Sequence, residues 1–167
     1  MRSRFQFSFI LVFVLVVSCD SNQVFDEYKT VPDVWSKDEV IQFSMNAPDT
    51  SNGYDLFVNI RNTSDYKYNN LFLIVELDHP NGKVLVDTLE YKMTAPDGSF
   101  LGTGFTDLKE NKLWYRGYDE DFKFPEEGEY TVKIQHAMRK NGDVYGIDEL
   151  QGITDIGFRI EESTRNQ

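Results

Sequence analysis

Hydrophobic and polar residues alternate with a period of two along most of the chain after residue 38, which predicts half-buried β-strands. In the first such segment, residues 39–45, Ile41, Phe43 and Met45 share one face and polar residues occupy the other. Alternation, or a nearly continuous apolar run at 71–77, predicts further strands at 54–62, 71–77, 84–91, 113–118, 129–136 and 153–160. The stretch 106–110 lacks alternation and is expected to form a short helical turn.

Seven to eight strands with few helical patterns predict an all-β fold, an antiparallel β-sandwich that is either immunoglobulin-like or jelly-roll-like. We place this domain at residues 38–161 and expect a disordered tail at 162–167. Residues 19–37 mix polar and aromatic residues without a period, which is typical of a tether. Its aromatic and aliphatic pairs, Val24-Phe25 and Val34-Trp35, are expected to dock on the domain.

The N-terminus has the features of an export signal. Arg2 and Arg4 precede an apolar stretch at 5–17, which as a helix would reach only about 20 Å and is too short for an ordinary transmembrane span. The following Val-Val-Ser-Cys at 16–19 resembles a bacterial lipobox. This resemblance implies a signal peptide at 1–18, cleavage before Cys19, and acylation of the Cys19 thiol and amino group. The alternative is an ordinary signal peptide with a cysteine near its cleavage site.

Charge and composition narrow the classes of function. The chain has 17 basic and 28 acidic residues and a net charge of −11; without residues 1–18, which hold two arginines and no acid, 15 basic residues remain and the net charge is −13. This acid excess argues against nucleic-acid binding, which needs a basic surface for the phosphates. The single cysteine excludes an internal disulfide and any site built from several cysteines.

Sequence motifs for catalysis are weak, so we expect no enzyme activity, no cofactor, no metal site and no small-molecule substrate. His79 is expected to be solvated in a turn and His136 to make a structural hydrogen bond; neither has the spacing of a zinc motif. The alternative to the absence of a metal site is that the acidic stretches 119–121 and 126–127 supply oxygen ligands for calcium. Asp87-Thr88-Leu89 resembles the acceptor tripeptide for O-glycosylation of exported Bacteroidota proteins, which makes Thr88 a possible modification site.

Two groups of residues are candidates for partner contacts. Gly102, Gly104 and Asp107 lie in a Gly-rich stretch that lacks the remaining residues of the dinucleotide and phosphate-binding motifs. It is expected either to face a partner or to form a structural turn in which Asp107 caps backbone N–H groups. The aromatic residues of the following strand are either exposed anchors for a partner or inward-facing core residues: Trp114, Tyr115 and Tyr118.

Several segments of the chain are similar to the GldH family of gliding-motility lipoproteins from Bacteroidota. They are Ala-Pro-Asp-Gly at 95–98, Leu-Gly-Thr-Gly-Phe-Thr-Asp-Leu at 101–108, Phe-Pro at 124–125 with Gly128 and Tyr130, Ile-Gln-His-Ala-Met-Arg at 134–139, and Leu-Gln-Gly-Ile-Thr-Asp-Ile-Gly-Phe-Arg-Ile-Glu at 150–161. The resemblance covers about residues 25–161. It implies a membrane lipoprotein needed for gliding, working with the type IX secretion system and the delivery of surface adhesins, and it carries over no catalytic residues.

From these observations we expect a non-catalytic assembly or scaffolding module. Cys19 would anchor it by lipid in the cell envelope, at the outer membrane and exposed to the periplasm. Its partners would be other envelope proteins of gliding motility or type IX secretion. The alternative is a carbohydrate-binding surface lipoprotein of a glycan-uptake system, which would need coplanar exposed aromatic side chains.

Overall fold

The computed structural model describes residues 22–32, 34–140 and 142–165, and these residues form ten β-strands. The described residues contain no helix, and hence none able to cross a membrane. In chain order the strands are β1 (Gln23–Thr30), β2 (Val34–Ser36), β3 (Ile41–Asn46), β4 (Tyr54–Asn62), β5 (Asn70–Asp78), β6 (Val84–Lys92), β7 (Lys109–Arg116), β8 (Glu129–His136), β9 (Glu149–Gln151) and β10 (Ile153–Glu162). The helical turn predicted near 106–110 is wrong, because Lys109 already begins β7 and Glu110 pairs across to Arg61 of β4.

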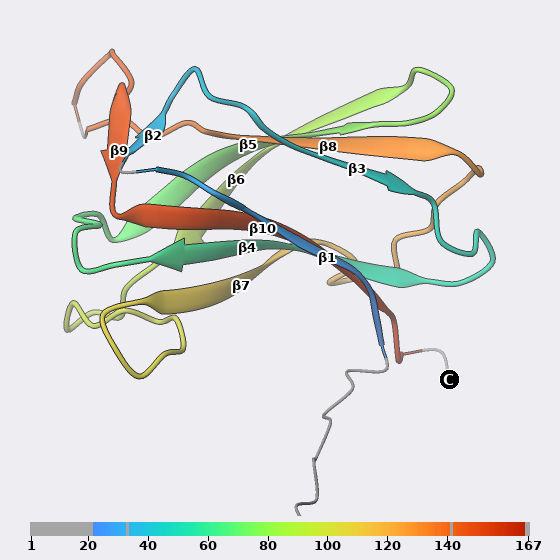
Figure 1. The fold of residues 1–167 in the computed structure, drawn as a ribbon, viewed down its shortest axis with the longest axis horizontal. Coiled ribbons are helices and arrows are strands. Elements are labelled where there is room, and N and C mark those ends of the chain that lie inside the picture. The colour runs from blue at the N-terminus through green and yellow to red at the C-terminus, as the bar shows by residue number, and fades with distance from the viewer. Residues whose placement is uncertain (1–21, 33, 141, 166–167) are drawn as a thin grey trace, which may run out of the picture.

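The strands form two four-stranded antiparallel sheets and a small ribbon, as Figure 1 shows. One sheet has the order β1-β10-β4-β7 and the other β3-β8-β5-β6, while β2 pairs with β9. With the ribbon set aside, the first strand pairs with the last (β1 with β10), the second with the seventh (β3 with β8), the third with the sixth (β4 with β7) and the fourth with the fifth (β5 with β6). This nested pairing of eight strands is the jelly roll. The predicted antiparallel sandwich is therefore confirmed, and its jelly-roll alternative is the one observed.

The segment predicted as a tether is largely part of the sheets. β1 pairs with β10 from Gln23↔Glu161 to Thr30↔Asp155, and β2 places Trp35 fully inside the core. The predicted boundary of 19–37 differs from the structure because β1 is an edge strand with mostly polar, exposed side chains, so its sequence shows no alternation. The predicted docking of Trp35 is confirmed.

The C-terminal boundary also differs from the prediction. β10 continues to Glu162, and the next residue, Ser163, is buried and donates a hydrogen bond from its hydroxyl to Asp121 (2.7 Å). Arg165 forms an ion pair with Asp121 (2.9 Å) and donates to the carbonyl oxygen of Tyr118 (2.6 Å). Residues 162–165 therefore pack on the domain instead of forming the disordered tail predicted for 162–167; residues 166–167 lie outside the described part.

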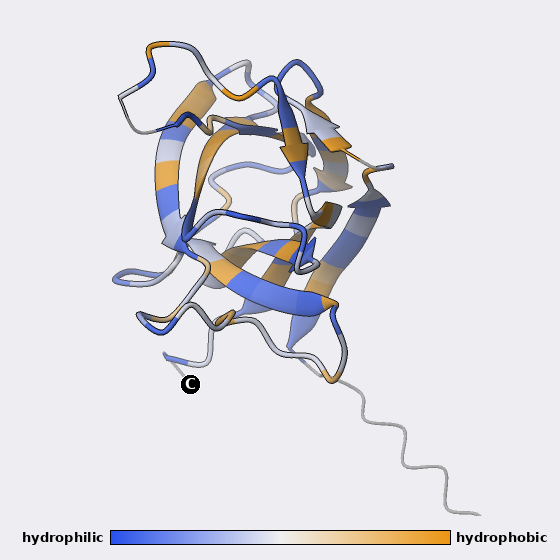
Figure 2. Ribbon diagram, turned by 90° about the vertical axis from the view of Figure 1, so that its left-hand side faces the viewer, coloured by the Kyte–Doolittle hydropathy of each residue, from blue (hydrophilic) through white to orange (hydrophobic). Residues whose placement is uncertain are grey.

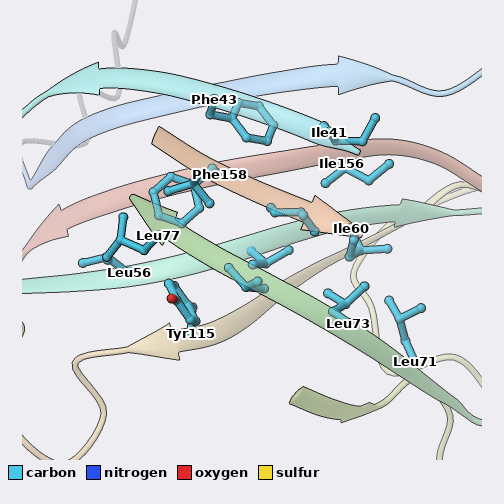
Figure 3. Packing of buried hydrophobic residues seen from close by; sticks show 14 of the residues in the cluster. Ile41, Phe43, Leu56, Ile60, Leu71, Leu73, Leu77, Tyr115, Ile156 and Phe158 are labelled. Carbon is cyan, nitrogen blue, oxygen red and sulfur yellow. The ribbon is translucent and has the colours of Figure 1, made fainter. Parts of the chain in front are cut away.

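The hydrophobic core lies between the two sheets. Hydrophobic and polar residues alternate along the strands, as the colouring of Figure 2 shows, and buried and exposed side chains alternate with them in β3. Both sheets supply the core residues drawn in Figure 3, for example Phe43 of β3, Leu77 of β5 and Phe158 of β10. Each fully buried aliphatic or aromatic side chain contributes about 1.5–3 kcal/mol relative to an exposed one. The alternation along the sequence is thus the direct cause of the two-layer architecture.

The sandwich has two distinct ends. At the terminal end, β1 begins at Gln23 beside Glu161, so the described chain starts and finishes on the same side (Figure 1). At the distal end, three connecting segments lie together: 63–70, 101–108 and 139–148. The two ends are separated by the length of β10, ten residues or roughly 30 Å. Figure 2 looks onto the distal end.

Candidate functional site

The Gly102–Asp107 segment is a tight turn whose glycines allow close backbone contacts. Thr103 and Glu110 exchange two backbone hydrogen bonds (2.9 and 2.8 Å), which brings the turn against the start of β7. Gly104 has a φ of +152°, and a Cβ there would lie 2.3 Å from the carbonyl oxygen of Leu108. A Cβ on Gly102 would lie 2.8 Å from Oδ1 of Asn111. Both glycines therefore have the backbone role that the sequence favoured over phosphate binding.

Asp107 links this turn to the neighbouring segment 63–70. Its Oδ1 accepts the backbone N–H of Ser64 at 3.0 Å. Hydrogen bonds from the hydroxyl and backbone N–H of Ser64 lower the pKa of Asp107. The capping role predicted for Asp107 is confirmed, and the N–H that it caps belongs to a segment 43 residues away in the sequence.

The same segment 63–70 is held from a second side by Gly152. Gly152 has a φ of +83° and accepts the backbone N–H of Thr63 (2.9 Å). A Cβ on Gly152 would lie 2.0 Å from the backbone nitrogen of Tyr66, so only glycine fits. The buried Tyr66 then donates its hydroxyl to the carbonyl oxygen of Asn70 (2.6 Å). Segments 101–108 and 150–161, both prominent in the family resemblance, thus shape one loop at the distal end.

The distal end also presents exposed apolar side chains. Phe105, at the tip of the Gly-rich turn, is fully exposed, and Leu101 and Leu108 beside it are 55% and 41% exposed. An aromatic ring in water on a loop held by backbone contacts is pre-ordered for binding, because little conformational entropy is left to lose. The 101–108 segment therefore has the properties of a partner-facing element as well as those of a structural turn.

The three aromatic candidates of β7 do not act as one group. Trp114 and Tyr118 are exposed (38% and 69%) and their rings lie 5.5 Å apart, with Phe57 of β4 against Trp114 at 4.4 Å. Tyr115 is only 8% exposed and contacts Phe158 in the core. Of the two alternatives for Tyr115, the structure shows the inward-facing core position, because successive residues of a strand point to opposite faces and Trp114 occupies the outer one. Burial raises the pKa of Tyr115 to about 12.

The Gly-rich turn and the exposed aromatic pair lie at opposite ends of β7. Lys109 pairs with Asn62 at the distal end, whereas Arg116 pairs with Leu56 toward the terminal end. Lys109 and Trp114 are five residue-to-residue steps apart along the strand, or about 17 Å. The structure therefore divides the sequence-predicted residues into a distal set, Gly102, Gly104 and Asp107, and a terminal set, Trp114 and Tyr118.

Thr88 lies on the outer face of β6 and is exposed. Its neighbour Asp87 faces the other side, where it accepts the hydroxyl of Tyr115 (3.1 Å) and pairs with Arg116. Tyr91, also on β6, donates its hydroxyl to the carbonyl oxygen of Trp114 (2.6 Å). These contacts join the edge strands β6 and β7 and leave the Thr88 hydroxyl accessible; its glycosylation stays a prediction.

Both histidines are buried. His136 is buried, its Nε2 lies 3.1 Å from the carbonyl oxygen of Trp35, and burial lowers its pKa, so the predicted structural hydrogen bond is confirmed. His79 is also buried, with its ring 5.0 Å from that of Tyr130. The predicted solvated position of His79 is therefore wrong: the hairpin 79–83 folds its first residue onto the core edge. Burial lowers the pKa of His79 too.

Of the acidic residues considered as calcium ligands, Asp121 pairs with Arg165 and accepts a hydrogen bond from Ser163. In the described ranges, no three His, Cys, Asp or Glu side chains converge in a group that could hold a metal ion. Cys19 lies outside the described residues, so its lipidation stays a prediction from the sequence.

One feature of the distal end was missed by the sequence analysis. A cavity of about 670 Å³ lies between segment 63–70 and the start of segment 139–148. Three basic side chains line it, those of Lys67, Arg139 and Lys140. Arg139-Lys140 is the one place in the sequence where two basic residues are consecutive, which was the available signal.

Comparison with known proteins gives consistent matches along nearly the whole chain. The model of the family described as GldH lipoprotein matches residues 23–160. The chain is 56% identical over 164 residues to "Gliding motility lipoprotein GldH homolog" of Christiangramia forsetii, covering 98% of this chain and 99% of that protein. It is 50% identical over 153 residues to "Gliding motility lipoprotein GldH" of Flavobacterium johnsoniae, covering 92% and 93%.

Among solved structures, the VP2 subviral particle of infectious bursal disease virus is similar with a TM-score of 0.36 and 16% identity, over 89% of this chain and 35% of that one. At this level of similarity the viral protein adds nothing to the functional argument.

Proposed function

Because the chain belongs to the GldH lipoprotein family, we propose that it is a lipid-anchored, non-catalytic assembly module of the gliding-motility machinery. The observation that carries this proposal is the family match over residues 23–160, which spans the whole sandwich from β1 into β10. Two relatives with this extent of identity are named gliding-motility lipoproteins. We further propose that its partners are envelope proteins of gliding motility and of the associated type IX secretion system.

The position of β1 makes the anchor short. Only three residues separate Cys19 from Gln23, the first residue of the sheet, and the four residue-to-residue steps between them reach at most about 14 Å. A lipid on Cys19 would therefore hold the terminal end close to the membrane surface. The distal end would then project roughly 30 Å from it, the length of β10. The length of the sandwich, and not a long tether, sets its reach.

This orientation selects the distal end as the partner-binding surface. Phe105 is its most exposed aromatic side chain, and Leu101 and Leu108 extend the apolar area. Interface anchors are typically large side chains of this kind that become buried in the complex. The net charge of −13 after residue 18 favours a partner with a basic surface. Neither histidine has an exposed position from which it could serve catalysis, which supports a non-catalytic role.

Gene deletion with complementation tests the proposal. We expect the deletion strain to lose colony spreading and adhesin secretion, and wild-type protein to restore both. Complementation with Phe105→Ser should fail although the protein accumulates in the membrane fraction, whereas Tyr118→Ser, an exposed aromatic of the terminal end, should restore spreading. Persistence of spreading and secretion in the deletion strain, with failed growth on a polysaccharide, would replace this proposal by the glycan-uptake alternative.

The anchor and its location need a separate experiment. Cys19→Ala should abolish incorporation of labelled fatty acid and release the protein from membranes. Density-gradient separation of the wild-type protein should place it with the outer membrane, and its resistance to protease in intact cells should place it on the periplasmic side. Membrane association of the Cys19→Ala variant without acyl label would refute the lipid anchor.

A further inference from the structure

We propose that the distal cavity binds a sugar unit carrying a carboxylate or phosphate group, as part of an anionic glycan. The cavity holds about 670 Å³, within the range typical of sites for small ligands. Its lining combines cations, amides and aromatic rings, as follows: Lys67, Tyr68, Asn69, Phe72, Arg139 and Lys140. This goes beyond the proposed assembly role, which would stand if the cavity bound nothing.

The charge of the lining is opposite to that of the protein. Three of the lining residues are basic and one, Asp143, is acidic, in a chain whose net charge after residue 18 is −13. Within the described ranges, Arg139 and Lys140 form no ion pair with an acidic side chain, whereas Arg159 is paired with Asp26 and Glu161. Lys67 has a 3.9 Å ion pair with Asp65 and donates to the carbonyl oxygen of Ser64 (2.7 Å). Unpaired cations around a concavity concentrate anions there.

The walls of the cavity are held in place before any ligand arrives. One wall, segment 63–70, is fixed by the close approach of Gly152 to Tyr66 and by the bond from Ser64 to Asp107. On the other side, Ala137 donates its backbone N–H to the carbonyl oxygen of the lining residue Phe72 (2.9 Å), and Asp143 donates its backbone N–H to the carbonyl oxygen of Lys140 (3.0 Å). Pre-ordered walls lower the entropic cost of binding, which distinguishes this cavity from a gap between mobile loops.

The shape of the cavity favours a compact sugar over an extended acidic peptide. Extended peptides bind mostly by adding a strand to a free sheet edge. The strand at the cavity, β5, has no free edge, because it lies between β8 and β6. The half-buried rings of Tyr68 and Phe72 can instead pack against the C–H face of a pyranose, while the guanidinium of Arg139 binds a carboxylate or phosphate with paired hydrogen bonds.

Titration calorimetry on the full-length lipoprotein in non-ionic detergent tests the proposal. The probes are trigalacturonate, which carries carboxylates, and glucose 6-phosphate; maltotriose, triglutamate and inorganic phosphate are the comparators. We expect saturable binding of one or both anionic sugars, and whichever binds identifies the charged group. Maltotriose should bind much more weakly, and rising salt should weaken the binding of the charged probes.

Two variants test whether the probes bind in this cavity. Arg139→Gln with Lys140→Gln should weaken binding by about tenfold or more, because charge-assisted hydrogen bonds are lost. Tyr68→Ala should weaken binding of the sugars but leave any affinity for inorganic phosphate unchanged. The matched control is Lys83→Gln with Lys123→Gln, which removes the same charge at exposed sites away from the cavity and should bind as wild type.

Each remaining outcome overturns the proposal. Absence of binding by both anionic sugars refutes the site, and undiminished binding by the Arg139/Lys140 double variant moves it elsewhere. If maltotriose binds as tightly as the anionic sugars, the charged group of the ligand is not needed for binding. Equal binding of triglutamate would assign the cavity to acidic peptides, and equal binding of inorganic phosphate would show that the sugar ring contributes nothing.

Discussion

The terminal end is closed by aromatic rings, whereas the distal end is held by close backbone contacts. At the terminal end, the ring of Phe124 lies 5.0 Å from those of Phe122 and Tyr130 and 5.5 Å from that of Tyr54. At the distal end, Gly152 approaches Tyr66 and Gly104 approaches Leu108 so closely that no side chain fits between them. Rings pack inside the terminal end, whereas the distal end carries the basic cavity and the exposed Phe105.

This difference suggests that the two ends of the sandwich have different roles, anchoring at the terminal end and binding at the distal end. At the terminal end, next to the site of the proposed lipid, Arg165 is paired with Asp121. The distal end leaves Arg139 and Lys140 without an acidic partner among the described residues. Four predictions test this comparison, taken from the largest expected effect to the smallest.

Phe124→Ala should produce the largest loss of stability. Phe124 is fully buried among three rings, and removing such a side chain costs about 3–5 kcal/mol through lost burial and the cavity left behind. Urea unfolding followed by circular dichroism measures the free energy. Phe105→Ala is the matched control at the distal end and should change it by less than about 0.5 kcal/mol, because Phe105 is fully exposed. Similar losses for the two variants would contradict the comparison.

Gly152→Val should destabilise the distal end by at least about 3 kcal/mol, because the new side chain meets the backbone of Tyr66 at a positive φ. Gly98→Val has a nearly identical φ of +85° but nothing within 4 Å of the new Cβ. It should cost only the conformational strain, about 1–2 kcal/mol. Equal unfolding free energies for the two variants would show that the contact with Tyr66 has no energetic role.

Tyr115→Phe should lower the free energy of unfolding by about 1 kcal/mol, the usual net value of one hydrogen bond. The lost bond is the one to Asp87, which helps to join β6 to β7; Asp87 keeps its pairing with Arg116. Tyr118→Phe, which removes an exposed hydroxyl just after the end of β7, is the control and should leave stability unchanged. If Tyr118→Phe lowers the free energy of unfolding more than Tyr115→Phe does, the hydroxyl that contributes more to stability lies on the outer face of the sheet.

The smallest effect concerns acid stability at the distal end. Burial lowers the pKa of His136 below the ordinary value of about 6.5 that it has in the unfolded chain. The unfolded state therefore binds more protons below about pH 6.5, and stability falls as the pH drops through the lowered pKa. Unfolding free energies from pH 8 to pH 5 should show a shallower decline for His136→Gln than for wild type. Parallel curves would mean that His136 titrates as it does in the unfolded chain.

Much of the fold could be predicted from the sequence, because alternation reports directly which face of a strand is buried. The segment 39–45 predicted one inward face with Ile41, Phe43 and Met45, and all three are in the core. Alternation did not indicate β1, because both of its faces are largely polar. It also did not indicate the start of β7 at Lys109, where pairing with β4 takes the place of hydrophobic alternation. In such strands the backbone partner, and not the side-chain pattern, stabilises the extended chain.

The candidate site was predictable only in parts. Asp107 was identified as a capping residue, because a carboxylate after two glycines is suited to accept backbone N–H groups, but the Ser64 that it caps lies far away in the sequence. Trp114 and Tyr115 are neighbours in the sequence and therefore face opposite sides of the strand, which decided that only Trp114 is exposed. For the basic cavity the sequence offered only the consecutive Arg139-Lys140 pair, since the walls come from segments about 70 residues apart.

By itself, the sequence determined the all-β class, the acidic character of the body, the predicted lipid site at Cys19 and the family, because each depends on local pattern or on similarity along the chain. Tertiary structure decided the jelly-roll order, the short distance from Cys19 to the first strand and the gathering of Lys67, Arg139 and Lys140 around one cavity. These depend on which strands pair and which loops meet. Such long-range contacts are set by the combined burial of both sheets, and no single segment encodes them.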